Sequence, residues 1–113
     1  MHELSIAMNI LNIATEALKN ENLKVIKEIE IDVGTQSGVV IDSLKFAFEM
    51  TIKDTVHESV KLTVNEIKAK SKCRKCYEVF DIDQYYTPCP KCGSFESSII
   101  QGKELKVKSL FLD

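Results

Sequence analysis

The sequence lacks the features that mark a secreted or membrane-spanning protein. No apolar run approaches the length needed to cross a bilayer. No basic segment followed by an apolar stretch opens the chain, so we expect no signal peptide and a cytoplasmic protein. There is no tryptophan and no long run of charge, and the net charge is only −2, whereas a general nucleic-acid or membrane binder would show a basic patch. At 113 residues we expect one domain, or one domain with a small metal-stabilised lobe.

Only four cysteines are present, and they form two C-x₂-C pairs separated by twelve residues: Cys73 with Cys76, and Cys89 with Cys92. Each pair can present two thiolates from one turn, and the segment between the pairs is long enough to bring them together. The spacing therefore predicts a tetrahedral Cys₄ site. Because protein sulfurs would fill every coordination position, we expect the ion, Zn(II), to be structural rather than catalytic.

The cysteines have three alternative uses. Two disulfides are disfavoured because nothing in the chain points to an oxidising compartment. Redox chemistry of a single pair is disfavoured because neither pair opens a helix in a βαβ context. Iron in a rubredoxin-like site stays open, since ligand softness and geometry do not separate it from zinc.

Hydrophobic periodicity predicts two helices. Apolar residues recur three and four positions apart, which indicates an amphipathic helix from about residue 3 to residues 20–22. Asp42-Ser43 offers an N-cap for a second helix. The residues expected on the inner faces are Leu4, Ala7, Met8, Leu11, Ala14 and Leu18 in the first helix, and Leu44, Phe46, Ala47, Phe48, Met50, Thr51 and Ile52 in the second.

Strict alternation of apolar and polar residues predicts three strands, at 27–34, 60–64 and 105–112. We expect an α+β fold in which the two helices cover one face of a small three-stranded mixed sheet. A zinc-ribbon-like lobe, residues 70–102, is inserted between the second and third strands. The remaining residues, 1–69 and 103–113, would form the main domain, and the chain must enter and leave the lobe at neighbouring points if those two strands pair.

Met1-His2-Glu3 offers a second set of metal ligands. The bulky His2 should block removal of Met1, so the α-amine stays one residue from an imidazole. Amine, deprotonated His2 amide and imidazole can close successive chelate rings, and such nitrogen donors suit Ni(II) or Cu(II). The positive end of the first helix would repel a cation, and the Glu3 carboxylate would have to offset that repulsion. The alternative is a solvated histidine without a function.

Several segments together resemble the HypA/HybF family, the nickel metallochaperones of [NiFe]-hydrogenase maturation. They are Met1–Ser5, Gly34–Val40 with Ser43–Glu49, the four cysteines, and Gln101–Leu105. The resemblance spans essentially the whole chain. It implies a nickel-binding domain and a separate structural zinc domain.

The resemblance also implies residue roles and partners. His2 would be the principal nickel ligand, aided by the Met1 amine and nearby backbone nitrogens, while Glu3 and Asp42 would tune or complete the site. Ni(II) would be a transient cargo, delivered to the hydrogenase large subunit together with a GTPase of the HypB type. Some relatives also serve urease, which adds urease accessory proteins as partners. The protein would not be an enzyme, and it would be a monomer or a weak homodimer.

Two other classes of function could account for parts of this sequence. A zinc-ribbon module that binds protein or nucleic acid explains the cysteines equally well and needs no role for His2, but it predicts salt-sensitive nucleic-acid binding that the acidic balance disfavours. A hydrolytic metalloenzyme would need an open metal site. The only other histidine is His57, and the chain contains no H-E-x-x-H motif.

Overall fold

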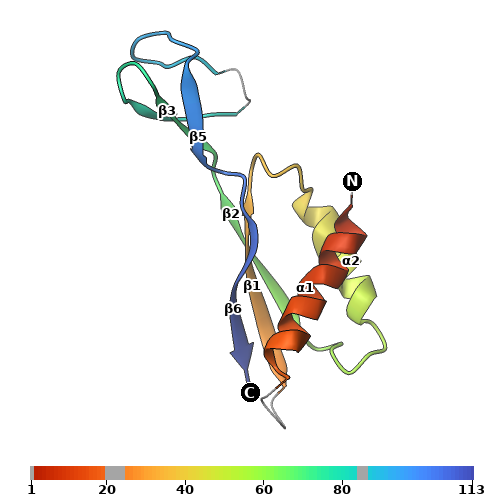
Figure 1. The fold of residues 1–113 in the computed structure, drawn as a ribbon. Helices are drawn as coiled ribbons and strands as arrows, with labels where there is room; N and C mark the ends of the chain where they lie inside the picture. Colours follow the sequence, from red (N-terminus) through yellow and green to blue (C-terminus); the bar gives the residue numbers. More distant parts are fainter. Residues whose placement is uncertain (1, 20–24, 84–86) are drawn as a thin grey trace.

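The molecule is elongated, with extents of 56 × 26 × 15 Å. The computed structural model describes residues 2–19, 25–83 and 87–113. Figure 1 shows the helices and one sheet at one end and the cysteine lobe at the other. In chain order the elements are α1 (Glu3–Ala17), β1 (Ile26–Gly34), α2 (Ile41–Ile52), β2 (Lys61–Ile67), β3 (Lys70–Cys73), β4 (Val79–Asp81), β5 (Ser97–Gln101) and β6 (Leu105–Leu112).

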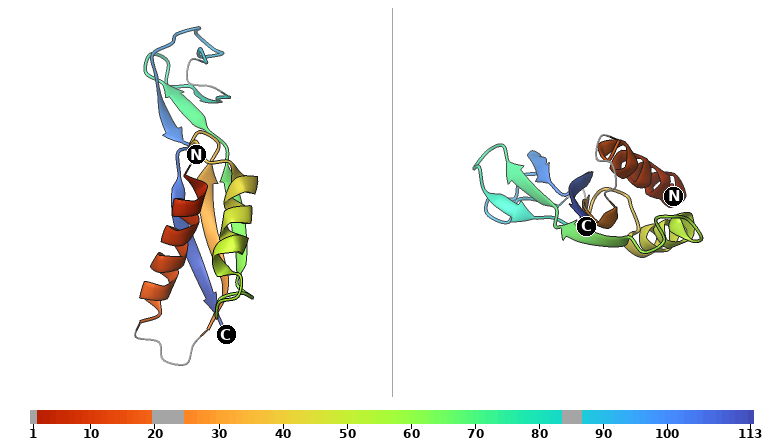
Figure 2. Two further views of the ribbon diagram at one scale, coloured as in Figure 1. Left: turned by 90° about the vertical axis from the view of Figure 1, so that its right-hand side faces the viewer. Right: turned by 90° about the horizontal axis from the view of Figure 1, so that it is seen from below.

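The main sheet has the strand order β2-β1-β6, and it is mixed, as predicted. β1 runs parallel to β2 and antiparallel to β6. A parallel pair needs a long crossover connection, and α2 supplies it. Both helices lie side by side on one face of this sheet, as Figure 2 shows. The predicted α+β architecture is therefore confirmed.

The alternation in β1 decides which face of the sheet is buried. Ile29, Ile31 and Val33 have no exposed surface and pack against the helices. The acidic residues between them lie on the opposite, open face, because successive side chains of a strand point to opposite sides. There the Thr63 hydroxyl donates a hydrogen bond to the Glu28 carboxylate at 2.5 Å, and the Asn65 amide donates one to Glu30 at 2.7 Å.

The predicted inner face of α2 is confirmed at Leu44, Ala47, Phe48 and Ile52, whereas α1 is rotated slightly from its predicted orientation. Leu4 and Met8 of α1 are 58% and 51% exposed, and Phe46 and Met50 of α2 are 64% and 52% exposed, so these four do not belong to the core. The buried residues of α1 are instead Glu3, Ala7, Ile10 and Ala14. Apolar side chains flank α1 on both sides, so their spacing fixes the period of the helix but not its rotation. The small alanines at the centre of the buried stripe, Ala7 and Ala14, let the backbone of α1 approach its neighbours closely.

The helix ends also differ from the prediction. α2 begins at Ile41, after the N-cap residue Val40, so Asp42 and Ser43 lie in its first turn and do not cap it. The backbone N–H of Val40 instead donates to the Glu3 carboxylate of α1 at 3.3 Å. α2 thus has no side-chain cap, and its N-cap residue is held through its own N–H by a carboxylate of the other helix. α1 ends at Ala17, and the predicted end at residues 20–22 lies outside the described residues.

The cysteine lobe contains a second sheet that the sequence did not predict, with the strand order β4-β3-β5. Its core is small and consists of Ala69, Cys73, Phe80, Ile82 and Cys89. The second and third predicted strands, β2 and β6, do not pair with each other, because β1 lies between them. The chain nevertheless enters and leaves the lobe at neighbouring points, since Lys70 of β3 pairs with Gln101 of β5.

The loop after β1 ties the lobe to the main sheet. The backbone N–H of Thr35 donates to the Ile67 carbonyl at 2.9 Å, and that of Gln36 donates to the Gly102 carbonyl at 2.7 Å. The Thr35 hydroxyl accepts a hydrogen bond from the Ala69 N–H at 3.0 Å. We refer to residues 34–36, 67–69 and 102–104 as the junction. Its hydrogen bonds join the loop after β1 to the two passages of the chain between the sheets, from β2 to β3 and from β5 to β6.

Candidate metal sites

The two C-x₂-C pairs form turns with the same backbone hydrogen bonds. In the first, the Cys73 N–H donates to the Glu78 carbonyl at 2.8 Å and the Tyr77 N–H donates to the Cys73 carbonyl at 3.0 Å. In the second, Cys89 donates to Ser94 and Gly93 donates to Cys89, both at 2.8 Å. The residue after each pair is left-handed, with φ of 64° at Tyr77 and 75° at Gly93. The two turns therefore present their sulfurs in equivalent ways.

The four sulfurs converge on one point. The Sγ atoms of Cys73 and Cys92 are 3.6 Å apart, as are those of Cys76 and Cys89. All four lie within 4.8 Å of one another. Tetrahedral zinc with Zn–S bonds of about 2.3 Å requires sulfur–sulfur separations of about 3.8 Å. The cluster, in which Cys73 and Cys89 are buried and Cys92 is exposed, therefore suits a structural zinc site.

The cysteine thiols differ in the direction in which their pKa values are shifted. The backbone N–H of Cys76 lowers the pKa of Cys73 to about 6, although burial raises it. The backbone of Glu78 lowers the pKa of Cys76, but burial and the neighbouring sulfurs raise it more, to about 12. Four adjacent thiolates repel one another, so they do not all ionise unaided at neutral pH. A divalent ion at their centre would stabilise all four in the ionised form that metals bind.

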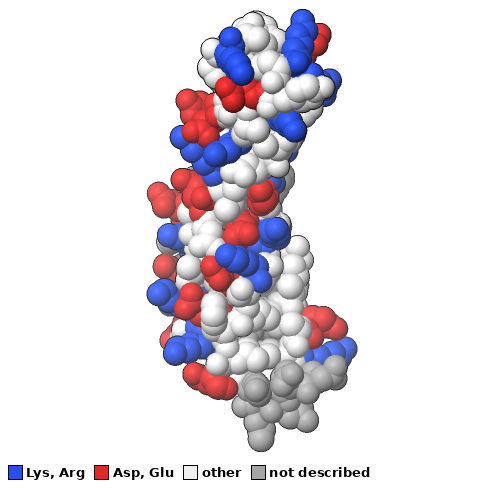
Figure 3. Space-filling view, turned by 90° about the vertical axis from the view of Figure 1, so that its left-hand side faces the viewer, with Lys and Arg blue, Asp and Glu red and all other residues white. Residues whose placement is uncertain are grey.

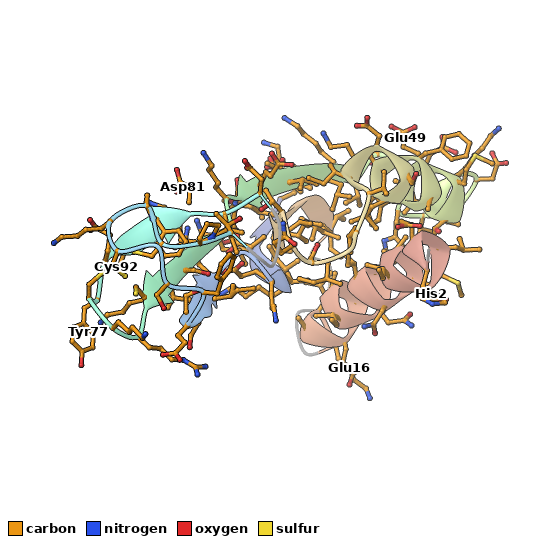
Figure 4. All side chains as sticks on the ribbon, turned by 90° about the horizontal axis from the view of Figure 1, so that it is seen from above. His2, Glu16, Glu49, Tyr77, Asp81 and Cys92 are labelled. Carbon is orange, nitrogen blue, oxygen red and sulfur yellow. The ribbon has the colours of Figure 1, made fainter. Side chains whose placement is uncertain are left out.

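The N-terminal set of predicted ligands is arranged differently. His2 is exposed at the start of α1, and Figure 4 shows it far from Cys92. Glu3 is buried, whereas Asp42 is exposed in the first turn of α2 and lines a shallow depression with Thr35 and Glu66. Met1 lies outside the described residues. Over residues 2–19, 25–83 and 87–113, the four cysteines are the only group of three or more His, Cys, Asp or Glu ligand atoms close enough to share an ion.

Both helices begin near the middle of the molecule, at the end of the main sheet that faces the cysteine lobe (Figure 2). Their positive ends therefore act together on the surroundings of His2. Glu3 and Asp42 place one carboxylate in the first turn of each helix. Burial raises the pKa of Glu3, but the Val40 backbone N–H and further hydrogen bonds outweigh it, and the net pKa lies below the ordinary value. Glu3 therefore carries its negative charge at neutral pH.

Glu3→Gln is expected to flatten the acid limb of the stability curve. A carboxyl whose pKa is lowered by folding stabilises the native state above its unfolded pKa, about 4.3, and loses that contribution as the pH falls through the folded value. The measurement is the free energy of urea unfolding between pH 6 and 3. Glu16→Gln, on the exposed face of α1, is the matched control. Equal acid limbs for wild type and Glu3→Gln would contradict the assigned contact with Val40.

The main domain, the second sheet and the four-sulfur cluster define a small α+β metal-binding protein. Over residues 1–112 the chain matches the family described as "Hydrogenase/urease nickel incorporation, metallochaperone, hypA". The chain belongs to this HypA family, whose members are nickel metallochaperones for hydrogenase maturation and bind nickel and zinc.

Two relatives can be aligned with this chain over its full length. The chain is 39% identical to the hydrogenase maturation factor HypA of Prosthecochloris aestuarii over 113 residues, which is all of both chains. It is 38% identical to that of Chlorobaculum parvum, again over all of both chains. It also resembles the solution structure of the Ni metallochaperone HypA from Helicobacter pylori, with a TM-score of 0.65 and 27% identity over 97% of this chain and 96% of that one. The family resemblance drawn from the sequence is thus confirmed.

Among the described residues no helix is both long and apolar enough to span a membrane.

The sequence patterns did not indicate the role of the junction loop. The Gln36 side chain donates a hydrogen bond to the Asp83 carbonyl of the lobe at 2.9 Å. The same loop leads to Val40, which contacts Glu3. The glycine at residue 34 was the one local sign that the chain is crowded there.

Proposed function

We propose that this chain holds Ni(II) transiently at its N-terminus and delivers it to the large subunit of [NiFe]-hydrogenase. The observation that carries the proposal is that His2 is exposed at the start of α1, on the side of the main sheet that faces the cysteine lobe, where both helices place an acidic residue in their first turn. An exposed site suits a cargo that has to be released to another protein. A chain acting in this way is a carrier and not an enzyme.

The donors for nickel would be the Met1 amine, the His2 amide nitrogen and the His2 imidazole. Five- and six-membered rings close between these atoms without help from the rest of the fold. Glu3 and Asp42 would act on the site through charge, by offsetting the positive ends of α1 and α2. Because the Glu3 carboxylate already accepts the Val40 N–H, it would also fix the start of α2 beside the site.

The zinc site would have a separate task. We propose Cys73, Cys76, Cys89 and Cys92 as the ligands of a structural Zn(II) that folds residues 70–102 as its own domain. Residues 1–69 and 103–113 would form the nickel-binding domain. Lys72, Arg74, Lys75 and Lys91, in or beside the two turns, would partly offset the net −2 of a zinc tetrathiolate.

Partners would be other proteins of hydrogenase maturation. A GTPase of the HypB type would act with the chain in delivery, and urease accessory proteins would be served as well if this member has both roles. Maturation of the large subunit takes place where that subunit is made, so the chain would act in the cytoplasm. As a single small unit it would function as a monomer or a weak homodimer.

His2→Ala tests the nickel site. It is expected to weaken Ni(II) binding by at least about tenfold, or 1.4 kcal/mol, because the imidazole donor is lost. Adding one residue before Met1 should have a similar effect, because it moves the α-amine out of the chelate ring. Isothermal titration of the zinc-loaded protein with Ni(II) measures both. His57→Ala, which changes the other histidine, is the control and should bind as wild type does. Wild-type affinity in either N-terminal variant would overturn the site.

A further inference from the structure

One edge of the main sheet is open. In the part of the chain that the structure describes, β6 pairs only with β1, so one side of this eight-residue strand has no neighbouring strand. An edge of this kind presents backbone N–H and C=O groups that can pair with another extended chain. Lysines on edge strands are a common protection against unwanted pairing, and β6 carries Lys106 and Lys108.

An apolar cleft runs beside this edge on the helix side of the sheet. It lies between α1 and β6 and has a volume of about 90 Å³. Most of its lining is apolar and includes Ile6, Ile10 and Ile13 of α1 and Leu105 and Val107 of β6, of which Ile13 and Leu105 are exposed; Asn9 and Lys106 complete it. Figure 3 shows an uncharged area next to a strip of acidic and basic side chains. The edge therefore has an apolar side.

On the opposite, open face of the sheet, β6 carries two basic residues beside the acidic residues of β1. Lys106 pairs in register with Asp32 of β1 and lies on the open face of the sheet. The Lys108 ammonium lies 3.9 Å from the Glu30 carboxylate of the same strand. β6 thus already pairs, along its other edge, with β1, a strand in which acidic and apolar residues alternate. The charge pattern of β6 is complementary to a strand of that composition.

We propose that the free edge of β6 is a docking site for an extended segment of another protein in which acidic and apolar residues alternate. The segment adds to the sheet as a fourth strand. Its apolar side chains enter the cleft between α1 and β6, and its acidic side chains lie beside Lys106 and Lys108. The backbone hydrogen bonds give affinity, and the alternation selects the partner.

Two other arrangements fit less well. Pairing of β6 with a second copy of β6 would place Lys106 and Lys108 of both copies on one face of a two-stranded ribbon, where like charges repel. Beside the other edge strand, β2, the described residues form depressions of mixed character, lined by the polar Thr35, Asp42 and Glu66 as well as by apolar residues such as Val39 and Ile41.

The probe is a synthetic peptide with the sequence of residues 27–34, KEIEIDVG, blocked at both ends. It is titrated into the full-length, zinc-loaded, ¹⁵N-labelled protein, and binding is followed by amide chemical shifts. We expect saturable shifts confined to β6 and the facing side of α1. A peptide with lysine at its three acidic positions should bind at least tenfold more weakly. A peptide methylated on alternate backbone nitrogens should lose binding, because it cannot donate to the edge.

The double variant Lys106→Gln with Lys108→Gln should weaken peptide binding at least threefold. Lys61→Gln, on the same open face but on β2, is its matched control and should bind as the wild type does. Shifts along β2, displacement of the chain's own β1, equal binding of the charge-reversed peptide, or no saturable binding at millimolar peptide would each overturn the proposal. Dimerisation through β6 in sedimentation would overturn it in favour of self-association. The peptide comparisons decide the matter even if the double variant does not fold.

Discussion

Removal of zinc with a chelator at neutral pH will unfold residues 70–102 and leave α1, α2 and the sheet β2-β1-β6 folded. In amide NMR spectra the signals of the lobe should collapse into the narrow range of an unfolded chain, while those of the main domain keep their dispersion. Binding of structural zinc contributes roughly 10–16 kcal/mol in small zinc modules, so no other single change to this chain should have as large an effect.

The reason lies in the composition of the lobe's core. Two of its five buried residues, Cys73 and Cys89, are themselves the proposed ligands. Without the metal, the described residues that remain to hold it together are Ala69, Phe80, Ile82 and the partly buried Ile99. Burial of so few apolar side chains is far too little to offset the conformational entropy of the whole lobe. The main domain has a separate and larger core of twelve buried residues from α1, β1, α2 and the segment before β2.

Two controls accompany the chelation. Readdition of Zn(II) should restore the lobe's spectrum, which separates metal loss from irreversible oxidation of the thiols. Cys92→Ser, a change at the most exposed of the four cysteines, should reproduce the unfolded lobe because it removes a ligand rather than core volume. A lobe that keeps its dispersion after zinc is shown to be absent would contradict the prediction.

The fold could be predicted from the sequence wherever a local pattern is compatible with only one arrangement. In β1, Ile29, Ile31 and Val33 alternate with acidic residues, and no other register buries the first set while solvating the second. The two cysteine pairs likewise allow one compact arrangement. In α1, by contrast, apolar residues surround more than half of the helix, and packing against α2 and the sheet decided that Ile10 faces inward and Met8 outward.

The parts of the candidate sites that escaped prediction depend on contacts between distant residues. Glu3 and Val40 are 37 positions apart, and no local pattern shows that the first would accept a hydrogen bond from the second. Gln36 and Asp83 are 47 positions apart and meet only because the junction brings three passages of chain together. The strands of the lobe are short, and β4 has three residues, too few for alternation to be recognised.

Gly34→Ala is expected to destabilise the protein by about 3 kcal/mol, at the upper end of the cost of overpacking. A Cβ built on Gly34 would lie 1.9 Å from the Gly102 carbonyl oxygen and 2.6 Å from the Lys103 nitrogen. Both are backbone atoms, and the Gly102 carbonyl is also held by the Gln36 N–H, so neither can swing aside as a flexible side chain could. The Gly34 N–H also donates to the Glu104 carbonyl at 2.8 Å, and this bond would be strained as the passages separate.

Thermal unfolding of the zinc-loaded protein measures the effect, and 3 kcal/mol corresponds to a fall in Tm of roughly 10 °C for a chain of this size. Gly93→Ala is the control, because its φ of +75° strains an alanine while its Cβ would meet no atom within 4 Å, so only about 1 kcal/mol should be lost. Gly102→Ala should cost at least as much as Gly34→Ala, since it combines a φ of +111° with a Cβ 2.3 Å from the Ala69 Cα. If Gly34→Ala were no worse than Gly93→Ala, the close approach of the strands at the junction would be wrong. If it is far worse, crowding rather than backbone conformation is what requires glycine at residue 34, and the lobe is held against the main sheet by contact of backbone on backbone.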